Sequence, residues 1–120
     1  MKIAIIDDSI FMRRLITGAI QQIQPDAVLT EFTNGEEALA QLPKLAPDLI
    51  TLDMLMPKMD GLALLEALKT SALRPRVIVI TANVQNSVRQ KCADFGVTDF
   101  IEKPITFDKL QASFTKLLAA

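Results

Sequence analysis

The chain of 120 residues contains no His, Trp or Tyr and a single Cys. One cysteine, Cys92, cannot form an internal disulfide and is typical of proteins from a reducing compartment. Because His is absent and only one Cys is present, the usual donor set of a zinc site is missing. The only aromatic residues are six Phe, which argues against an aromatic platform that stacks nucleic-acid bases.

Neither sign of charge dominates, since 13 Lys and Arg stand against 14 Asp and Glu, for a net charge of −1. Domains that bind nucleic-acid phosphates are usually basic, so this balance argues against a direct nucleic-acid partner. No apolar run approaches the roughly 20 residues that span a bilayer, and the opening MKIAIID becomes acidic too early for a signal peptide. We therefore expect a cytoplasmic protein without membrane insertion, folded as one domain over 1–120.

Short apolar runs alternate with stretches of helical spacing along the chain. The runs predicted as strands are KIAII (2–6), VLTEF (28–32), DLITL (48–52), RVIVI (76–80) and TDFI (98–101). Ser9, Asn34 and Thr106 stand where helix N-caps belong, and Arg13 and Arg14 fall largely opposite the apolar stripe of the first helix. The fivefold alternation predicts parallel strands joined by right-handed crossovers, an α/β fold.

The apolar runs differ in a way that predicts the strand order. IAII, LITL and VIVI are apolar almost throughout, as expected for strands covered by helices on both faces. VLTEF and TDFI alternate polar with apolar residues, as edge strands do. The simplest arrangement is a flavodoxin-like, doubly wound (βα)5 three-layer sandwich with strand order 2-1-3-4-5, in which a crevice opens between the carboxyl ends of strands 1 and 3.

Polar side chains interrupt the apolar pattern where the strands end. Asp7 and Asp8 follow the first strand, Asp53 the third, Thr81 the fourth and Lys103 the fifth. The carboxyl ends of parallel strands share one edge of a sheet, so we expect these five residues to lie together. Three converging carboxylates repel one another unless a cation intervenes, and Mg²⁺ takes carboxylate oxygens together with water and phosphoryl oxygens.

Each of these residues also has an ordinary structural interpretation. Asp7 and Asp8 are favourable before a helix N-terminus, and Asp53 can begin a turn. Thr81 is a common strand residue, and Lys103 taken alone reads as a solvated lysine. Only the coincidence of all five residues at one sheet edge favours a functional site.

The ordered motifs resemble a known family. IIDDS with MRRL following, LDMLMPKMDG, VIVITA and FIEKP occur in the order and spacing of the receiver domain of two-component response regulators. The match spans the whole chain and is most similar to the small stand-alone receivers of the chemotaxis type. The resemblance implies a single receiver domain, 1–120, without an output domain, that acts as a phosphorylation-activated signalling switch.

The resemblance also implies roles in phosphoryl transfer. Asp53 would be the phosphoacceptor, which attacks the phosphorus of a phosphohistidine on a partner. Lys103 would pair with Asp53 and then with a phosphoryl oxygen, and the Thr81 hydroxyl would bond another. The Lys103–Pro104 peptide would be cis, which an X-Pro bond adopts at modest cost.

The implied metal ligands come from three positions along the chain. Asp8, Asp53 and the backbone carbonyl of Leu55 would bind Mg²⁺, with Mn²⁺ as an alternative, and Asp7 would act through a water molecule. No other cofactor is implied.

The implied switch joins this site to a distant surface. Thr81 and Phe100 would be its moving residues, and Met54 and Asn83 would line the approach of water to the phosphoryl group. The output face would comprise the fourth helix, the fifth strand and the fifth helix, roughly 84–116. The implied partners are a sensor histidine kinase or a histidine phosphotransfer protein, and a downstream target protein on that face.

Three rival interpretations remain. An aspartyl-phosphate phosphohydrolase of the haloacid dehalogenase type would need a second Asp two residues after the nucleophile, where this chain has Leu55. A flavodoxin-like FMN protein would need a Ser/Thr/Gly-rich phosphate loop after the first strand. A degenerate receiver would bind partners without phosphorylation. We expect a switch that catalyses only its own phosphotransfer and autodephosphorylation, and no other enzyme activity.

Overall fold

The computed structural model describes residues 1–119, which form five strands and five helices in strict alternation. The strands are β1 (Lys2–Ile6), β2 (Val28–Phe32), β3 (Leu49–Leu52), β4 (Arg76–Thr81) and β5 (Asp99–Glu102). The helices are α1 (Ile10–Ile23), α2 (Gly35–Leu45), α3 (Gly61–Lys69), α4 (Asn86–Asp94) and α5 (Phe107–Ala119). Within the described residues, no helix has the length and apolar character needed to cross a membrane.

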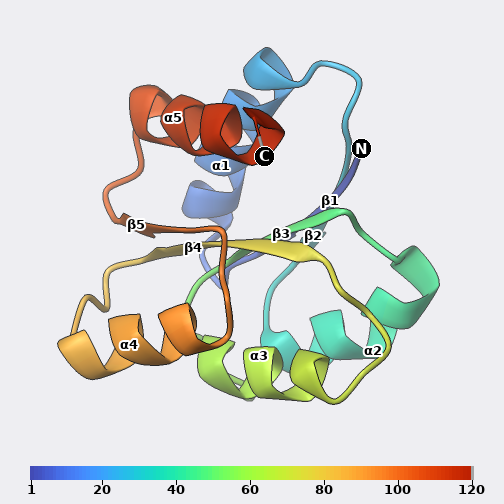
Figure 1. Cartoon of the computed structure of the whole chain (residues 1–120). Coiled ribbons are helices and arrows are strands. Elements are labelled where there is room, and N and C mark those ends of the chain that lie inside the picture. The colour runs from blue at the N-terminus through green and yellow to red at the C-terminus, as the bar shows by residue number, and fades with distance from the viewer. Residues whose placement is uncertain (120) are drawn as a thin grey trace.

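All strand pairs are parallel, and their order is β2-β1-β3-β4-β5. Helices α1 and α5 cover one face of the sheet, and α2, α3 and α4 cover the other (Figure 1). The predicted flavodoxin-like winding is therefore confirmed, including the central position of β1, β3 and β4. The chain reverses direction across the sheet between β1 and β3, where such folds bind ligands.

Alternate strand residues feed two separate apolar cores. Ile3, Ile5 and Ile78 point toward α1 and α5, whereas Ala4 and Ile50 join the core beneath α2, α3 and α4. Every residue of β3 is buried, which explains why this strand is apolar on both faces. A polar residue in this region is therefore an exception that needs a specific partner.

Side-chain caps fix where most helices begin. Ser9, Asn34 and Thr106 accept hydrogen bonds from backbone N–H groups at the starts of α1, α2 and α5, as predicted, and Asp60 does the same for α3. In contrast, α4 begins after Gln85, which makes no side-chain capping bond. A missing N-cap typically weakens a helix by about 1 kcal/mol, so α4 is the least anchored helix at its N-terminus.

One residue of α1 departs from the predicted helix pattern. Arg13 was expected on the polar face with Arg14, but only Arg13 is buried, with 8% of its surface exposed. The prediction for Arg13 was wrong because its guanidinium bonds to Glu31 on β2 and to the Asp7 carbonyl, which takes it out of solvent.

The start of α3 is pressed against the end of β3. A Cβ atom added at Gly61 would lie 2.5 Å from the Asp53 carbonyl oxygen and 2.4 Å from the Met54 Cε atom. Both distances are too short for real atoms, so only glycine permits this approach. The geometry of the β3–α3 loop, and with it the placement of Asp53, depends on the missing side chain.

We expect Gly61→Ala to lower the free energy of unfolding by about 2 kcal/mol, because the added methyl group overpacks a backbone contact. Gly18→Ala is the matched control, since Gly18 lies inside α1 with nothing within 4 Å of an added Cβ. That change should raise the free energy of unfolding by about 1 kcal/mol, because Ala has the higher helix propensity. Urea unfolding followed by circular dichroism measures both; equal effects would contradict the close approach at Gly61.

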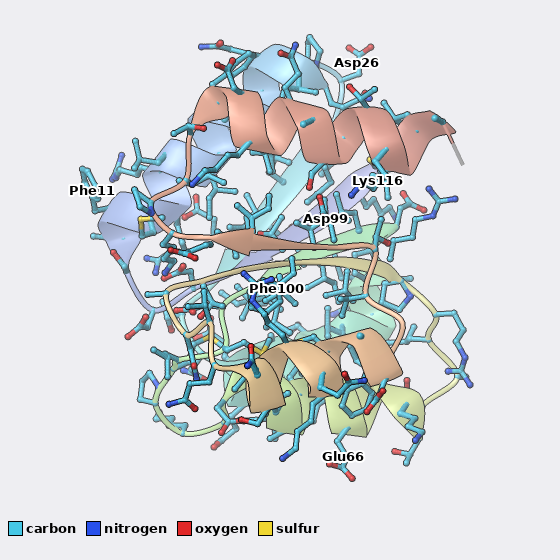
Figure 2. The ribbon with its side chains drawn as sticks, turned by 60° about the vertical axis from the view of Figure 1, so that its left-hand side comes forward. Phe11, Asp26, Glu66, Asp99, Phe100 and Lys116 are labelled. Atoms are coloured by element: carbon cyan, nitrogen blue, oxygen red, sulfur yellow. The ribbon has the colours of Figure 1, made fainter. Side chains whose placement is uncertain are left out.

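An ionic contact fastens α5 to β5. Ser113, which is fully buried, donates a hydrogen bond to Asp99 Oδ2, and Lys116 Nζ lies 3.4 Å from Asp99 Oδ1. The N–H of Phe100 also donates to Asp99 Oδ1. In Figure 2, Asp99 is directed from β5 toward Lys116 on α5, while Phe100 lies on the α4 side of the strand.

These contacts predict an acid-sensitive contribution to stability. Burial alone raises the pKa of Asp99, but the Ser113 and Phe100 hydrogen bonds and Lys116 outweigh it and hold that pKa below its ordinary value. The ionised carboxylate therefore stabilises the fold above about pH 3.9, the unfolded-state value, and this contribution is lost as the pH falls further through the folded pKa.

We therefore expect Asp99→Asn to lower stability more at pH 7 than at pH 3. Asp26→Asn, at an exposed site after α1, serves as the control and should change stability little at either pH. Thermal unfolding at the two pH values measures the difference, and a constant effect of Asp99→Asn would contradict the prediction.

Candidate functional site

Three carboxylates meet at the carboxyl edge of the sheet. The ladder continues past the strand ends, because the N–H of Asp53 donates to the carbonyl of Ile6 at 3.1 Å. Carboxylate oxygens of Asp7, Asp8 and Asp53 all lie within 4.8 Å of one another. Asp7 and Asp53 are 1% and 4% exposed, whereas Asp8 is exposed. The predicted convergence of these residues is present.

Backbone N–H groups orient the two buried carboxylates. Ser9 N–H donates to Asp7 Oδ1 at 2.9 Å, and Leu55 N–H donates to Asp53 Oδ1 at 3.1 Å. Each Asp thus bonds the backbone two residues onward, the turn geometry that Asp favours. The second oxygen of each carboxylate remains directed into the site.

Lys103 occupies the space between these second oxygens. Its Nζ lies 2.9 Å from Asp7 Oδ2 and 3.3 Å from Asp53 Oδ2. The N–H of Lys103 donates to the carbonyl of Thr81 at 2.9 Å, and the Lys103–Pro104 peptide is cis. The lysine is thus delivered from the edge strand β5 to the centre of the sheet edge.

Burial and charge act in opposite directions on this group of side chains. Burial raises the pKa of Asp7, and the charge of Asp53 adds to the increase, although hydrogen bonds from Ser9 and Lys103 oppose it. Burial lowers the pKa of Lys103, but its hydrogen bond to Asp7 and the charge of Asp53 outweigh this effect, so the pKa lies above its ordinary value. Lys103 therefore carries its positive charge at neutral pH.

Thr81 and Asn83 complete the same edge from β4. Leu52 pairs with Val79, so Asp53 and Thr81 end neighbouring strands. Thr81 is fully buried, and its Oγ1 accepts a hydrogen bond from Asn83 N–H at 3.2 Å. Because the oxygen acts as an acceptor there, its own proton remains to be donated.

Met54 does not lie where the sequence analysis expected it. The side chain is 3% exposed, and its Sδ lies 3.7 Å from Cys92 Sγ in the core beneath α4. The side chain after it, Leu55, is 53% exposed beside Asp53. In this structure Leu55, rather than Met54, therefore presents an apolar side chain at the approach to the carboxylate. The loop between β3 and α3 sets this difference, because β3 ends at Leu52 and Met54 packs against Cys92 of α4.

Comparison with known proteins agrees with this geometry. The sequence model of the response regulator receiver domain matches residues 3–115. The chain belongs to this family.

Relatives include both a single receiver and longer proteins. The chemotaxis protein CheY of Bacillus subtilis is 33% identical, over 98% of this chain and 97% of that protein. A protein-glutamate methylesterase/protein-glutamine glutaminase of Oleidesulfovibrio alaskensis is 35% identical over 88% of this chain, which spans only 29% of that relative. Among solved structures, the Mn²⁺-bound form of response regulator Rcp1 is 25% identical, with a TM-score of 0.82, and covers 92% of this chain and 89% of its own.

Family membership accounts for the function at a general level. Receiver domains of two-component systems are phosphorylated by histidine kinases, bind a divalent metal and signal to downstream partners. This chain is therefore a phosphorylation-activated signalling switch.

The donor set of this receiver fits a hard divalent cation. Carboxylate oxygens are the ligands that such cations prefer, whereas zinc sites normally include His or Cys. Within residues 1–119, the Asp8 carboxylate accepts no hydrogen bond, so its oxygens remain available to a ligand. The structure gives no contact that assigns the Leu55 carbonyl to the same site, and that assignment stays a prediction.

Phe100 lies on β5, on the opposite face of the strand from Asp99 (Figure 2). It is half-buried, and the Arg89 guanidinium of α4 sits 4.5 Å from the centre of its ring. Figure 2 shows Phe100 between β5 and α4. The ring therefore contacts the helix that lacks a side-chain cap, and Arg89 is a neighbour of the predicted switch residue that sequence reasoning missed.

We expect Mg²⁺ to stabilise the folded receiver through the acidic cluster. At a concentration ten times its dissociation constant, the ion should raise the free energy of unfolding by about 1.4 kcal/mol, because it binds only the folded state. Thermal unfolding with and without Mg²⁺ measures this as a rise in Tm of a few degrees. Asp8→Asn should lose most of the rise, and an unchanged rise would exclude Asp8 as a ligand.

Proposed function

We propose that Asp53 accepts a phosphoryl group from a phosphohistidine on a sensor histidine kinase or a histidine phosphotransfer protein. The observation that carries this proposal is the buried carboxylate of Asp53, whose Oδ2 lies 3.3 Å from the charged Lys103 amine. A bond forms between an Asp53 oxygen and phosphorus as the bond from phosphorus to the imidazole nitrogen breaks, and the imidazole leaves with the electron pair.

The proposed metal is Mg²⁺, with Mn²⁺ as an alternative. Asp8, Asp53 and the carbonyl of Leu55 would hold it, and Asp7 would act through a water molecule. The acidic cluster within 4.8 Å supports the three carboxylates of this set. When bound, the cation neutralises charge on the transferring oxygens. The Mn²⁺-bound relative described above is consistent with either ion.

Side chains of this chain supply the remaining interactions. Leu55 N–H holds Asp53 Oδ1 at 3.1 Å and so orients the attacking carboxylate. Lys103 follows the negative charge from the carboxylate to a phosphoryl oxygen. Thr81 donates its hydroxyl proton to another phosphoryl oxygen. These residues bind and position the group, and phosphoryl transfer needs little else.

The proposed output face is formed by α4, β5 and α5, where a downstream protein binds. A phosphoryl group adds about −1.5 to −2 charge at Asp53, which attracts Thr81 and Lys103 and so acts on the ends of β4 and β5. Phe100 transmits this change in β5 to α4. Its contact with Arg89 of α4 supports this role. We further propose that the switch acts in the cytoplasm together with its kinase.

The phosphohydrolase alternative lacks a catalytic group. The position two residues after Asp53 is Leu55, whose exposed side chain has no proton to give or take. We propose that the chain catalyses only its own phosphotransfer and autodephosphorylation.

Incubation with acetyl phosphate and Mg²⁺ tests the assignment of Asp53. Intact-mass spectrometry should detect one phosphoryl adduct that survives acid and is lost in base, because an acyl phosphate is a labile anhydride. Asp53→Asn should form no adduct, and EDTA should prevent it in the wild type. Asp60→Asn is a matched control, since Asp60 follows the same strand but only caps α3.

Three outcomes would count against the proposal. An adduct on Asp53→Asn would move the phosphoacceptor elsewhere. No adduct in the wild type would favour a receiver that works without phosphorylation. Repeated turnover of small phosphate esters would favour the hydrolase.

A further inference from the structure

Arg13 is a buried cation with two hydrogen-bond partners, one a backbone carbonyl and the other a carboxylate. Its Nη1 donates to the backbone carbonyl of Asp7 at 2.7 Å, and its Nε donates to Glu31 Oε1 at 3.0 Å. Only 8% of the residue is exposed, whereas Glu31, on the edge strand β2, is exposed. Burying a guanidinium costs free energy unless such bonds compensate for its lost hydration. The arginine thus bridges β2 to the loop that carries the acidic pair.

The bonded carbonyl belongs to the peptide between Asp7 and Asp8. The side chain of Asp7 is oriented without Arg13, because Ser9 N–H and Lys103 hold its two oxygens. Asp8 has no such restraint, since its exposed carboxylate accepts no hydrogen bond within residues 1–119. The direction of the Asp8 side chain is therefore determined largely by the backbone that Arg13 holds.

We propose that Arg13 is a positioning residue for the metal site, which fixes the Asp7–Asp8 peptide so that the Asp8 carboxylate faces Asp7 and Asp53. This inference rests on the proposed function, because it assumes that Asp8 is a metal ligand. Glu31 holds the guanidinium from the far side and balances its charge. Partners outside the first set of ligands commonly control metal affinity in this way.

Charge and positioning predict opposite effects when Arg13 is neutralised. A positive charge behind the acidic cluster repels an incoming cation, so its removal would tighten metal binding if charge alone mattered. Loss of the bond to the Asp7 carbonyl frees the Asp7–Asp8 peptide, so neutralising Arg13 weakens metal binding if positioning dominates. The sign of the change in affinity therefore separates the two roles.

The test measures binding of Mn²⁺ alone by the electron paramagnetic resonance signal of the free ion, without phosphorylation. Arg13→Gln should raise the dissociation constant about tenfold relative to the wild type. Arg13→Lys should recover part of the affinity, because it keeps a charged donor at the same helix position. Arg14→Gln is the matched control, since Arg14 is exposed beside Arg13 and the change removes the same charge; it should not weaken binding.

A kinetic readout separates positioning from a general loss of structure. With acetyl phosphate, Arg13→Gln should need about tenfold more Mg²⁺ for half-maximal phosphorylation, while the rate at saturating Mg²⁺ stays close to that of the wild type. Circular dichroism checks that each variant is folded. If Arg13→Gln does not fold, Arg13→Lys carries the comparison, because it retains the buried charge, and it should then show the weakened Mn²⁺ binding by itself.

The failures of this inference and of the proposed function differ. Wild-type protein that binds no Mn²⁺ would overturn the proposed metal site. If the wild-type protein binds Mn²⁺ and folded Arg13→Gln binds it equally or more tightly, only the positioning role is overturned. Weakening by Arg14→Gln as large as that by Arg13→Gln would also overturn it, because the effect would then not depend on the bond from Arg13 to the Asp7 carbonyl.

Discussion

Mutual repulsion among three carboxylates is the constraint on which this receiver depends. Asp7, Asp8 and Asp53 bring their oxygens within 4.8 Å of one another at the edge of a sheet whose interior is apolar. Lys103 contacts two of these carboxylates but supplies only one positive charge, which leaves a deficit of about two charges, the charge of one divalent cation. The same imbalance favours a divalent metal at this edge. In the proposed function, a phosphoryl group on Asp53 would add negative charge that draws Lys103 and Thr81 toward it.

The helices that could report this change are attached unequally. Asp99 joins α5 to β5 through Ser113 and Lys116. Helix α4 has no side-chain cap and meets β5 where Arg89 covers Phe100. In the proposed function, a charge change at the ends of β4 and β5 would meet a helix held by side-chain contacts on one side and a helix without an N-terminal side-chain cap on the other.

Much of the site was predictable because it depends on features that are local in sequence. A buried parallel strand must be apolar, so a charge such as Asp53 at its end is conspicuous, and β1 ends in the same way with Asp7. The prediction failed where side-chain direction mattered. Met54 packs into the core against Cys92 while Leu55 is exposed, and the path of the loop between β3 and α3 decides this. Arg13 reads as a solvated helix charge in sequence, and its burial follows only from its tertiary contacts with Glu31 and the Asp7 carbonyl.

The sequence by itself determined the alternation of strands and helices and the strand order. It also determined the sheet edge that holds Asp7, Asp8, Asp53, Thr81 and Lys103. Each of these features depends on hydrophobic periodicity or on polarity at strand ends, which residues close together in the sequence define. The tertiary structure alone decided which side chains form hydrogen bonds or ion pairs with one another. Contacts such as Lys103 with Asp7, Ser113 with Asp99 and Arg13 with Glu31 join residues 14 to 96 positions apart. Their energies depend on distance and burial, and folding sets both.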